Sequence, residues 1–272
     1  MEYEIKPKNR ININLRELWA FRELLYFFTW RDIKIKYKQT VLGALWAILQ
    51  PFLLMLVFTI FFSKALNFDS SALPYPIFVY TGLILWNVFS VGITNSGNSL
   101  VNNANMIKKI FFPRLLLPLS SILSTLVDFV MTFVLFIGLM IYFDIYPNIL
   151  QLLIVLPTAL LITLFTTFGL GAFLSALNVK YRDFRYVIPF MVQILLFLTP
   201  VIYPLTIVPN EFAQQLLALN PMSGAIALLR GSFTGVFPDV MILVQSLGIS
   251  VLLFFSGVFY FHRTEYYFAD LA

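Results

Sequence analysis

Several groups that carry chemistry in proteins are rare or missing in this chain of 272 residues. It contains no cysteine and one histidine, and only 11% of its residues are charged. Disulfides and thiolate metal sites are therefore excluded. No Gly-Lys dipeptide occurs, so the chain lacks the G-x-x-x-x-G-K-[ST] loop that cradles nucleotide phosphates. No D-x-x-x-D or D-D-x-x-D cluster is present to hold magnesium on a diphosphate substrate. His262 stands at the edge of an apolar run, where an interface anchor is more common than a metal ligand or a base. We therefore expect no enzyme, no metal site and no cofactor bound by this chain.

Hydrophobic residues make up 60% of the chain, whereas a soluble domain usually has roughly 45–50% apolar and about 25% charged residues. This composition excludes a soluble enzyme and predicts an all-α membrane protein. The net charge of +5 does not indicate a nucleic-acid partner, because the basic residues flank apolar runs and form no separate domain. The first forty residues are charged and show no cleavable signal peptide.

Six transmembrane helices are predicted. The first, Val41–Ser63, carries no charge and would be about 34 Å long as a helix, enough to cross a bilayer core of about 30 Å. Pro51 near its middle predicts a kink. The other five spans are expected at Ile77–Gly97, Leu115–Tyr142, Ile149–Leu177, Tyr186–Tyr203 and Asp239–Phe261.

The distribution of basic residues predicts the orientation. Half of the 18 lysines and arginines precede residue 40. The connectors after the second and fourth spans are basic, whereas the outer connectors contain only Lys64 and Arg230. Because basic loops stay on the cytoplasmic side, both termini are expected in the cytoplasm, with the protein in the cytoplasmic (inner) membrane.

Two segments outside the spans have their own pattern. In residues 1–40, expected to be cytoplasmic, Asn14 and Glu17 predict a capped start for an amphipathic helix in the membrane interface; a solvated arm is the alternative. In the fifth connector, asparagine and proline predict two short re-entrant helices at Glu211–Leu219 and Pro221–Arg230. These helices form either an outer gate or a lid that only seals the bundle. Residues 41–272 form the membrane domain.

Asp128 is the only ionisable residue deep inside a predicted span. Such a residue is costly in lipid and marks a candidate functional site. One hypothesis is an ion-coupled carrier centred on Asp128. The alternative, which we favour because no basic partner is apparent, is a structural carboxylate hydrogen-bonded to Ser124, Thr125 or Thr132 on its own helix, or to another span.

Five stretches in order resemble one family over nearly the whole chain. They are RDIKIKYKQTVLGALWAILQP (31–51), NNANMIKKIFFPRLLLPLS (102–120), LNVKYRDFRY (177–186), LTPVIYPL (198–205) and LNPMSGAIALLRG (219–231). Together they are similar to the permease subunits of ABC-2 type transporters, in the branch that exports polysaccharides such as O antigen or teichoic acid. An ABC-2 exporter of a smaller lipid or drug differs only in cargo and stays open as an alternative.

The resemblance implies a homodimer that works with two copies of a separate ATP-binding subunit, which binds ATP and Mg. The cargo would be a polyprenyl-diphosphate-linked glycan, with membrane lipid around the dimer. The helix that couples to the ATPase would fall on about Asn102–Phe112, and its contact residues would be Asn102, Asn103, Asn105, Met106, Ile107, Lys108, Lys109 and Phe111, with a lesser contact at Lys180, Arg182 and Arg185.

Further roles follow from the same resemblance. The first and fifth spans would form a lateral gate and, with the second, line the channel; the candidate residues are Trp46, Gln50, Tyr80, Trp86, Phe89, Phe197 and Tyr203. The lipid diphosphate would meet a basic group at the inner face, namely Arg31, Lys34, Lys36 and Lys38. The alternative for that group is that it only orients the protein.

Overall fold

The computed structural model describes residues 15–38, 43, 45–65 and 73–268. The described part is helical and contains no strand. Its α-helices are α1 (Leu15–Ala20), α2 (Arg22–Lys38), α3 (Leu45–Ala65), α4 (Tyr75–Asn102), α5 (Ala104–Ile107), α6 (Leu116–Tyr142), α7 (Ile149–Lys180), α8 (Phe184–Leu198), α9 (Glu211–Ala218), α10 (Pro221–Thr234) and α11 (Val240–Thr264), with short 3-10 turns η1 (Leu205–Ile207) and η2 (Glu265–Tyr267).

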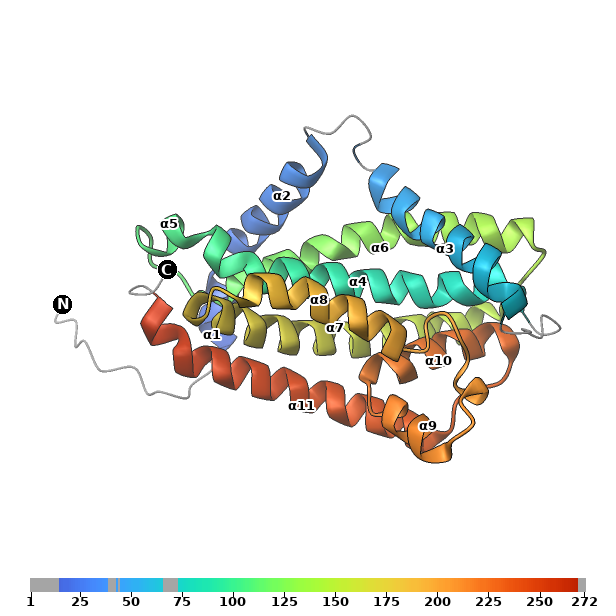
Figure 1. The fold of residues 1–272 in the computed structure, drawn as a ribbon. Coiled ribbons are helices and arrows are strands. Elements are labelled where there is room, and N and C mark those ends of the chain that lie inside the picture. The colour runs from blue at the N-terminus through green and yellow to red at the C-terminus, as the bar shows by residue number, and fades with distance from the viewer. Residues whose placement is uncertain (1–14, 39–42, 44, 66–72, 269–272) are drawn as a thin grey trace.

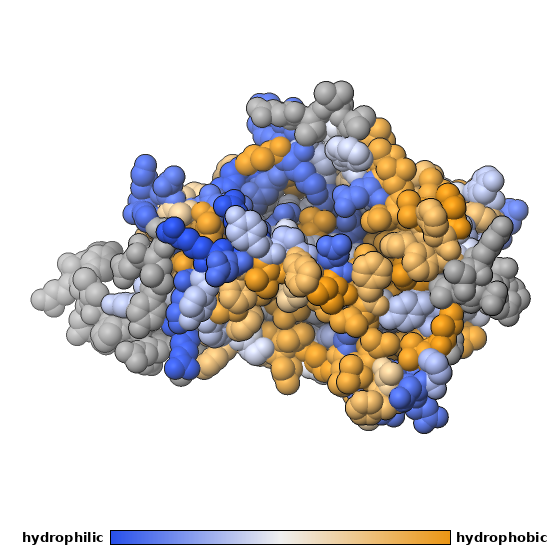
Figure 2. Space-filling model, viewed as in Figure 1, coloured by the Kyte–Doolittle hydropathy of each residue, from blue (hydrophilic) through white to orange (hydrophobic). Residues whose placement is uncertain are grey.

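The bundle is built around α4. This helix packs against α3, α6, α7, α8 and α10, and 78% of its most apolar 18-residue window is buried, compared with 17% for α3. Figure 1 shows α4, α6, α7 and α11 running side by side, whereas the C-terminal end of α2 and the N-terminal end of α3 stand away from the bundle. Hydrophobic residues cover much of the face formed by α3 and α8, and hydrophilic residues gather toward the end where α5 lies (Figure 2). Such a surface suits a bilayer better than water.

The all-α membrane fold predicted from composition is confirmed. Among the described residues, five helices are long and apolar enough to cross a membrane, and α9 with α10 forms a pair bent by 95°. Helix α8 is apolar but shorter, and it leads from the end where α7 stops toward the end where α9 and α10 lie (Figure 1). It ends at Leu198 rather than at the predicted Tyr203, because Thr199 is extended and Pro200 has no amide hydrogen to donate.

The second predicted span is longer than expected. We placed its end at Gly97 because a polar run follows, but α4 continues to Asn102. The polar side chains are satisfied within the helix: Asn98 Nδ2 donates to the Thr94 carbonyl at 2.8 Å, and Ser99 Oγ to the Ser96 carbonyl at 2.7 Å. A neutral polar run can therefore stay helical inside a protein.

The N-terminal region forms two helices, α1 and α2. The basic residues Arg31–Lys38 lie inside α2, which packs on α6. Aromatic side chains such as Trp19 and Trp30 are exposed, while Phe28 on the other side is buried. The proposed cap at Asn14, residues 1–13, the beginning of the first span at 41–42 and the outer loop at 66–72 lie outside the described residues.

The two short helices of the fifth connector begin where the sequence predicts. Asn210 Oδ1 accepts from the Phe212 amide at 2.9 Å, and Asn220 Oδ1 accepts from the Met222 amide at 3.0 Å. Helix α10 continues four residues beyond the predicted Arg230 and stops at Gly235, whose φ of 72° is accessible to glycine without strain.

Candidate functional site

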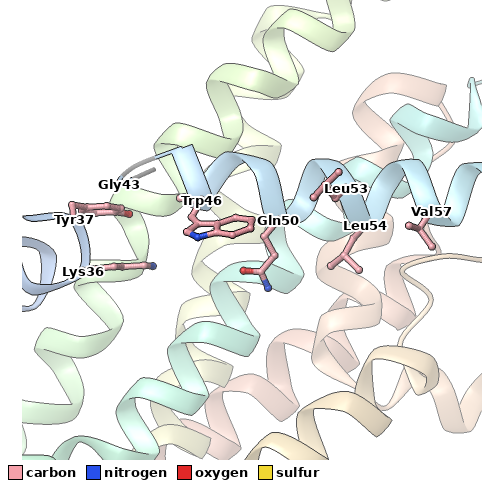
Figure 3. A pocket seen from close by; sticks show the side chains of 9 residues that line it. Lys36, Tyr37, Gly43, Trp46, Gln50, Leu53, Leu54 and Val57 are labelled. Carbon is pink, nitrogen blue, oxygen red and sulfur yellow. The ribbon is translucent and has the colours of Figure 1, made fainter. Parts of the chain in front are cut away.

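An open cavity of about 560 Å³ lies between the end of α2 and the first half of α3 (Figure 3). Its polar end carries Lys36, Tyr37 and Gln50, with the indole of Trp46 beside them. Leu53, Leu54 and Val57 line the rest along α3. A cavity with a polar end and an apolar wall suits an amphiphile.

A second cavity of about 200 Å³ adjoins the first, since Gln50 and Leu54 line both. It is enclosed by α3, α4 and α8, the three helices that correspond to the predicted channel spans. Amide and hydroxyl groups converge on it from all three helices: Gln50, Asn87, Ser90 and Gln193. The described lining contains no charged side chain, so this cavity offers hydrogen bonds to a neutral, hydroxyl-rich molecule.

The seven predicted channel residues fall into three places. Trp46, Gln50 and Trp86 line the two cavities. Tyr80 is fully buried, and its hydroxyl donates to the Thr132 carbonyl on α6 at 3.2 Å. Phe89 is also buried.

The remaining two residues lie near the end of α8. Phe197 is exposed, and Tyr203 donates to the Phe197 carbonyl at 3.0 Å. The structure thus brings three of the seven together at the cavities, while Tyr80 and Phe89 belong to the packing of the bundle.

Asp128 has a basic partner, which corrects our expectation. Its side chain is 2% exposed and pairs with Lys36 Nζ, and the Tyr37 hydroxyl donates to its second oxygen. The hydroxyls of Ser124, Thr125 and Thr132, which we expected to bind it, instead donate to carbonyls one turn earlier in α6. This pair could not be predicted from the sequence because its two members are 92 residues apart.

The four basic residues predicted to bind a diphosphate differ in their contacts. Arg31 pairs with its neighbour Asp32 at 2.9 Å, and Asp32 in turn accepts from Ser120 on α6 at 3.3 Å. Lys36 is held by Asp128. Lys34 and Lys38 are exposed on α2. The predicted group therefore comprises two paired cations, Arg31 and Lys36, and two exposed ones, Lys34 and Lys38.

The predicted coupling segment is only partly helical. Helix α5 covers one turn, Ala104–Ile107, and a turn follows it. The side chains of Asn102, Asn105, Lys108, Lys109 and Phe111 are exposed, those of Asn103 and Met106 are partly exposed, and Ile107 is buried. The second basic connector, with Lys180, Arg182 and Arg185 exposed, lies at the same end of the molecule as α5 (Figure 1). Both predicted ATPase contacts are thus presented on one end.

Arg230 is a buried residue whose importance the sequence reasoning missed. From α10 its guanidinium donates to three backbone carbonyls: Phe78 in α4 at 3.0 Å, and Pro200 and Val201 after α8 at 2.7 and 2.5 Å. It also lies 3.5 Å from the centre of the Phe78 ring. The sequence feature that could have indicated its role is that Arg230 is a lone arginine in an otherwise apolar connector.

Comparison with known proteins identifies relatives over most of the chain. Residues 23–234 match the model of the family described as ABC-2 type transporter. The O-antigen export system permease protein RfbA of Myxococcus xanthus is 31% identical over 93% of this chain and 97% of its own length. The protein of the same name from Klebsiella pneumoniae is 29% identical over 92% and 95%. The polysialic acid transport protein KpsM of Escherichia coli is 27% identical over 74% and 77%. With a family model that covers most of its length and a helical bundle built for a membrane, this chain belongs to the ABC-2 type transporter family.

Proposed function

We propose that this chain is the membrane-spanning permease subunit of an ATP-driven exporter for a polyprenyl-diphosphate-linked polysaccharide such as O antigen. The observation that carries the proposal is the similarity to O-antigen export permeases over at least 92% of the chain. The two adjoining cavities support it, because they offer an apolar wall along α3 for a lipid chain and an uncharged polar lining for sugar hydroxyls.

The proposal assigns the energy source to another protein. Two copies of this chain would pair with two copies of an ATP-binding subunit, which would dock on α5 and on the connector at Lys180–Arg185. Both termini would lie in the cytoplasm and the bundle in the inner membrane. In a homodimer with two-fold symmetry, a single conduit can run along the axis, and α3, α4 and α8 would line it.

A reconstitution experiment tests this function. The chain is co-expressed with the ATP-binding subunit of its own locus, purified, and placed in proteoliposomes with the lipid-linked glycan of that locus. We expect glycan translocation that requires ATP and both proteins. Uphill translocation by this chain alone, or translocation driven by an ion gradient without ATP, would overturn the proposal.

The ion-coupled alternative has a separate test at Asp128. If the protein were a carrier centred on this carboxylate, Asp128→Asn would stop transport because it removes the charge. No ATP-binding subunit would then co-purify with the chain. In the exporter, Asp128 holds Lys36 and Tyr37 in place. We therefore expect the variant to lower stability while ATP-dependent translocation persists in the protein that remains folded.

A further inference from the structure

Hydrogen bonds join the residue that follows α11 to the residues just after the predicted coupling segment. Arg114 follows that segment by two residues and leads into α6, and Glu265 is the first residue after α11. The Arg114 amide donates to Glu265 Oε1 at 3.3 Å, and the Arg114 guanidinium donates to the Glu265 backbone carbonyl. His262 Nδ1 lies 3.1 Å from the other carboxylate oxygen. Two segments 151 residues apart are thus joined by two hydrogen bonds, both donated by Arg114.

Apolar packing reinforces this contact. Phe268, just beyond η2, is 1% exposed and meets Phe261 edge-on at 5.2 Å, and the Arg114 guanidinium lies 6.0 Å from its ring centre. Ile107 and Phe112, the buried side chains of the coupling segment, belong to the same apolar cluster. Phe268 therefore shares an apolar cluster with the segment that we expect to contact the ATPase.

Helix α11 is in turn tightly bound to the rest of the bundle. Gly257 and Gly169 bring the backbones of α11 and α7 so close that a side chain on either would collide with the other helix. Helix α7 ends at the second basic connector. Near the far end of α11, Ser246 occupies the space beside Gly224 of α10. Because close-packed interiors transmit strain, we expect a displacement of the C-terminal end of α11 to reach α7 and α10.

We propose that Arg114 and Glu265 are positioning residues that transmit movement of the coupling segment to α11, and through α11 to α7 and the re-entrant helix α10. This inference rests on the proposed function. Movement of the coupling segment would then reach the bundle through α11 as well as through the flanking helices α4 and α6. The path through α11 also links the two predicted ATPase contacts, because α7 leads into the second of them. Arg230 on α10 connects this path to the end of α8.

The test uses the full complex with its ATP-binding subunit in proteoliposomes. The variants are Glu265→Ala, Arg114→Ala and the double variant, and the matched control is Arg263→Ala, an exposed cation in the last turn of α11. Three quantities are measured: the amount of ATP-binding subunit that co-purifies, the rate of ATP hydrolysis, and the glycan translocated per ATP. We expect binding and hydrolysis to persist, while translocation per ATP falls at least about fivefold, the lower end of typical coupling between sites. The double variant should fall no further than the single variants, since both interrupt one link.

Two results would overturn the inference. One is unchanged translocation per ATP in Glu265→Ala. The other is a loss of folded protein, of subunit binding and of translocation in parallel, while the glycan translocated per ATP stays unchanged. That result would give the contact a purely structural role. Failure of the wild-type chain to bind the ATP-binding subunit would instead overturn the proposed function, and this inference with it.

A second measurement needs neither the partner nor a correctly assembled complex. Because the chain has no cysteine, a single cysteine at the exposed Lys109 can carry a spin label on the permease alone. We expect the label to become more mobile when Glu265→Ala is added and to stay unchanged when Arg263→Ala is added. Equal mobility in all three proteins would show that the contact does not hold the coupling segment.

Discussion

Asp128 and Lys36 form the one ion pair that joins α2 to the interior of the bundle among the described residues. Replacing Lys36 with Met leaves a carboxylate that is 2% exposed without its cation. We expect this variant to lose about 1–3 kcal/mol of stability, near the lower end because Lys36 itself is 38% exposed. A double-mutant cycle with Asp128→Leu, read by thermal unfolding in detergent, should show that the double variant loses less than the sum of the singles. Additive losses would mean that the pair carries no coupling energy.

Arg230 provides a second prediction for a single residue. A lysine ammonium cannot span carbonyls that a planar guanidinium reaches together, and the carbonyls of Pro200 and Val201 would lose their donor. We expect Arg230→Lys to lower stability by about 1.5–3 kcal/mol, the usual value for a hydrogen bond to a charged group. Thermal unfolding measures the loss, with the exposed Arg263→Lys as the matched control. Equal melting temperatures for both variants would contradict the role assigned to Arg230.

Glu265 predicts a dependence of stability on pH. Burial acts to raise the pKa of its carboxyl, but the hydrogen bond and charge of His262 and the amide and charge of Arg114 outweigh burial, so the pKa lies below its ordinary value. A depressed carboxyl pKa stabilises the folded protein above the unfolded pKa of about 4.3, and this contribution disappears as the pH falls through the folded pKa.

The measurement compares melting temperatures of the wild type and Glu265→Gln as the pH is lowered. We expect the variant to be less stable near neutral pH and the difference between the two proteins to shrink below about pH 4. A difference that stays constant down to about pH 3 would show that the carboxylate charge contributes nothing.

At the scale of elements, the sequence predicts helices well where composition changes sharply and poorly where it does not. The starts of α9 and α10 were predictable because asparagine and proline act locally. The end of α4 was not, since the residues after Gly97 are polar yet satisfied inside the helix. The path of α2 was not predictable either, because it depends on the contacts of Asp32 and Lys36 with α6, and such distant contacts leave no periodic signal.

The two capping asparagines form a matched pair for a prediction. Both accept from an amide two residues on, but only Asn220 also donates to another element, through Nδ2 to Thr199 Oγ1 at 2.8 Å. We expect Asn210→Ala to cost about 1 kcal/mol as a lost cap and Asn220→Ala to cost about 1 kcal/mol more for the additional hydrogen bond. Thermal unfolding of the two variants checks this order. A larger loss for Asn210→Ala would contradict it.

At the scale of the whole molecule, the sequence indicated the class of protein but not the arrangement of its site. The resemblance placed the channel on three spans; the smaller cavity lies between the corresponding helices α3, α4 and α8, whereas the larger one lies between α2 and α3. Aromatic character alone could not separate Trp86, which lines a cavity, from Tyr80, which is buried against α6. Asn87, Ser90 and Gln193 were missed because uncharged polar residues are common in helices, and only the fold shows that they converge.

The uneven burial of the helices leads to the last prediction. Helix α3 leaves most of its surface uncovered, as α11 also does, and Ile194 on α8 is exposed. In the proposed dimer a second copy of the chain covers α3 and α8, and lipid covers α11. Single cysteines at Ile60 on α3 or at Ile194 are therefore expected to cross-link two protomers in membranes under mild oxidation. Leu153 on α7 is equally apolar and is 70% exposed. A chain with its single cysteine at this position should not cross-link, because lipid surrounds the position in the proposed dimer. Since the natural chain has no cysteine, every cross-linked band reports the introduced residue. Cross-linking at Leu153 but at neither α3 nor α8 would place the dimer interface on the opposite side of the bundle and remove the proposed conduit from α3, α4 and α8.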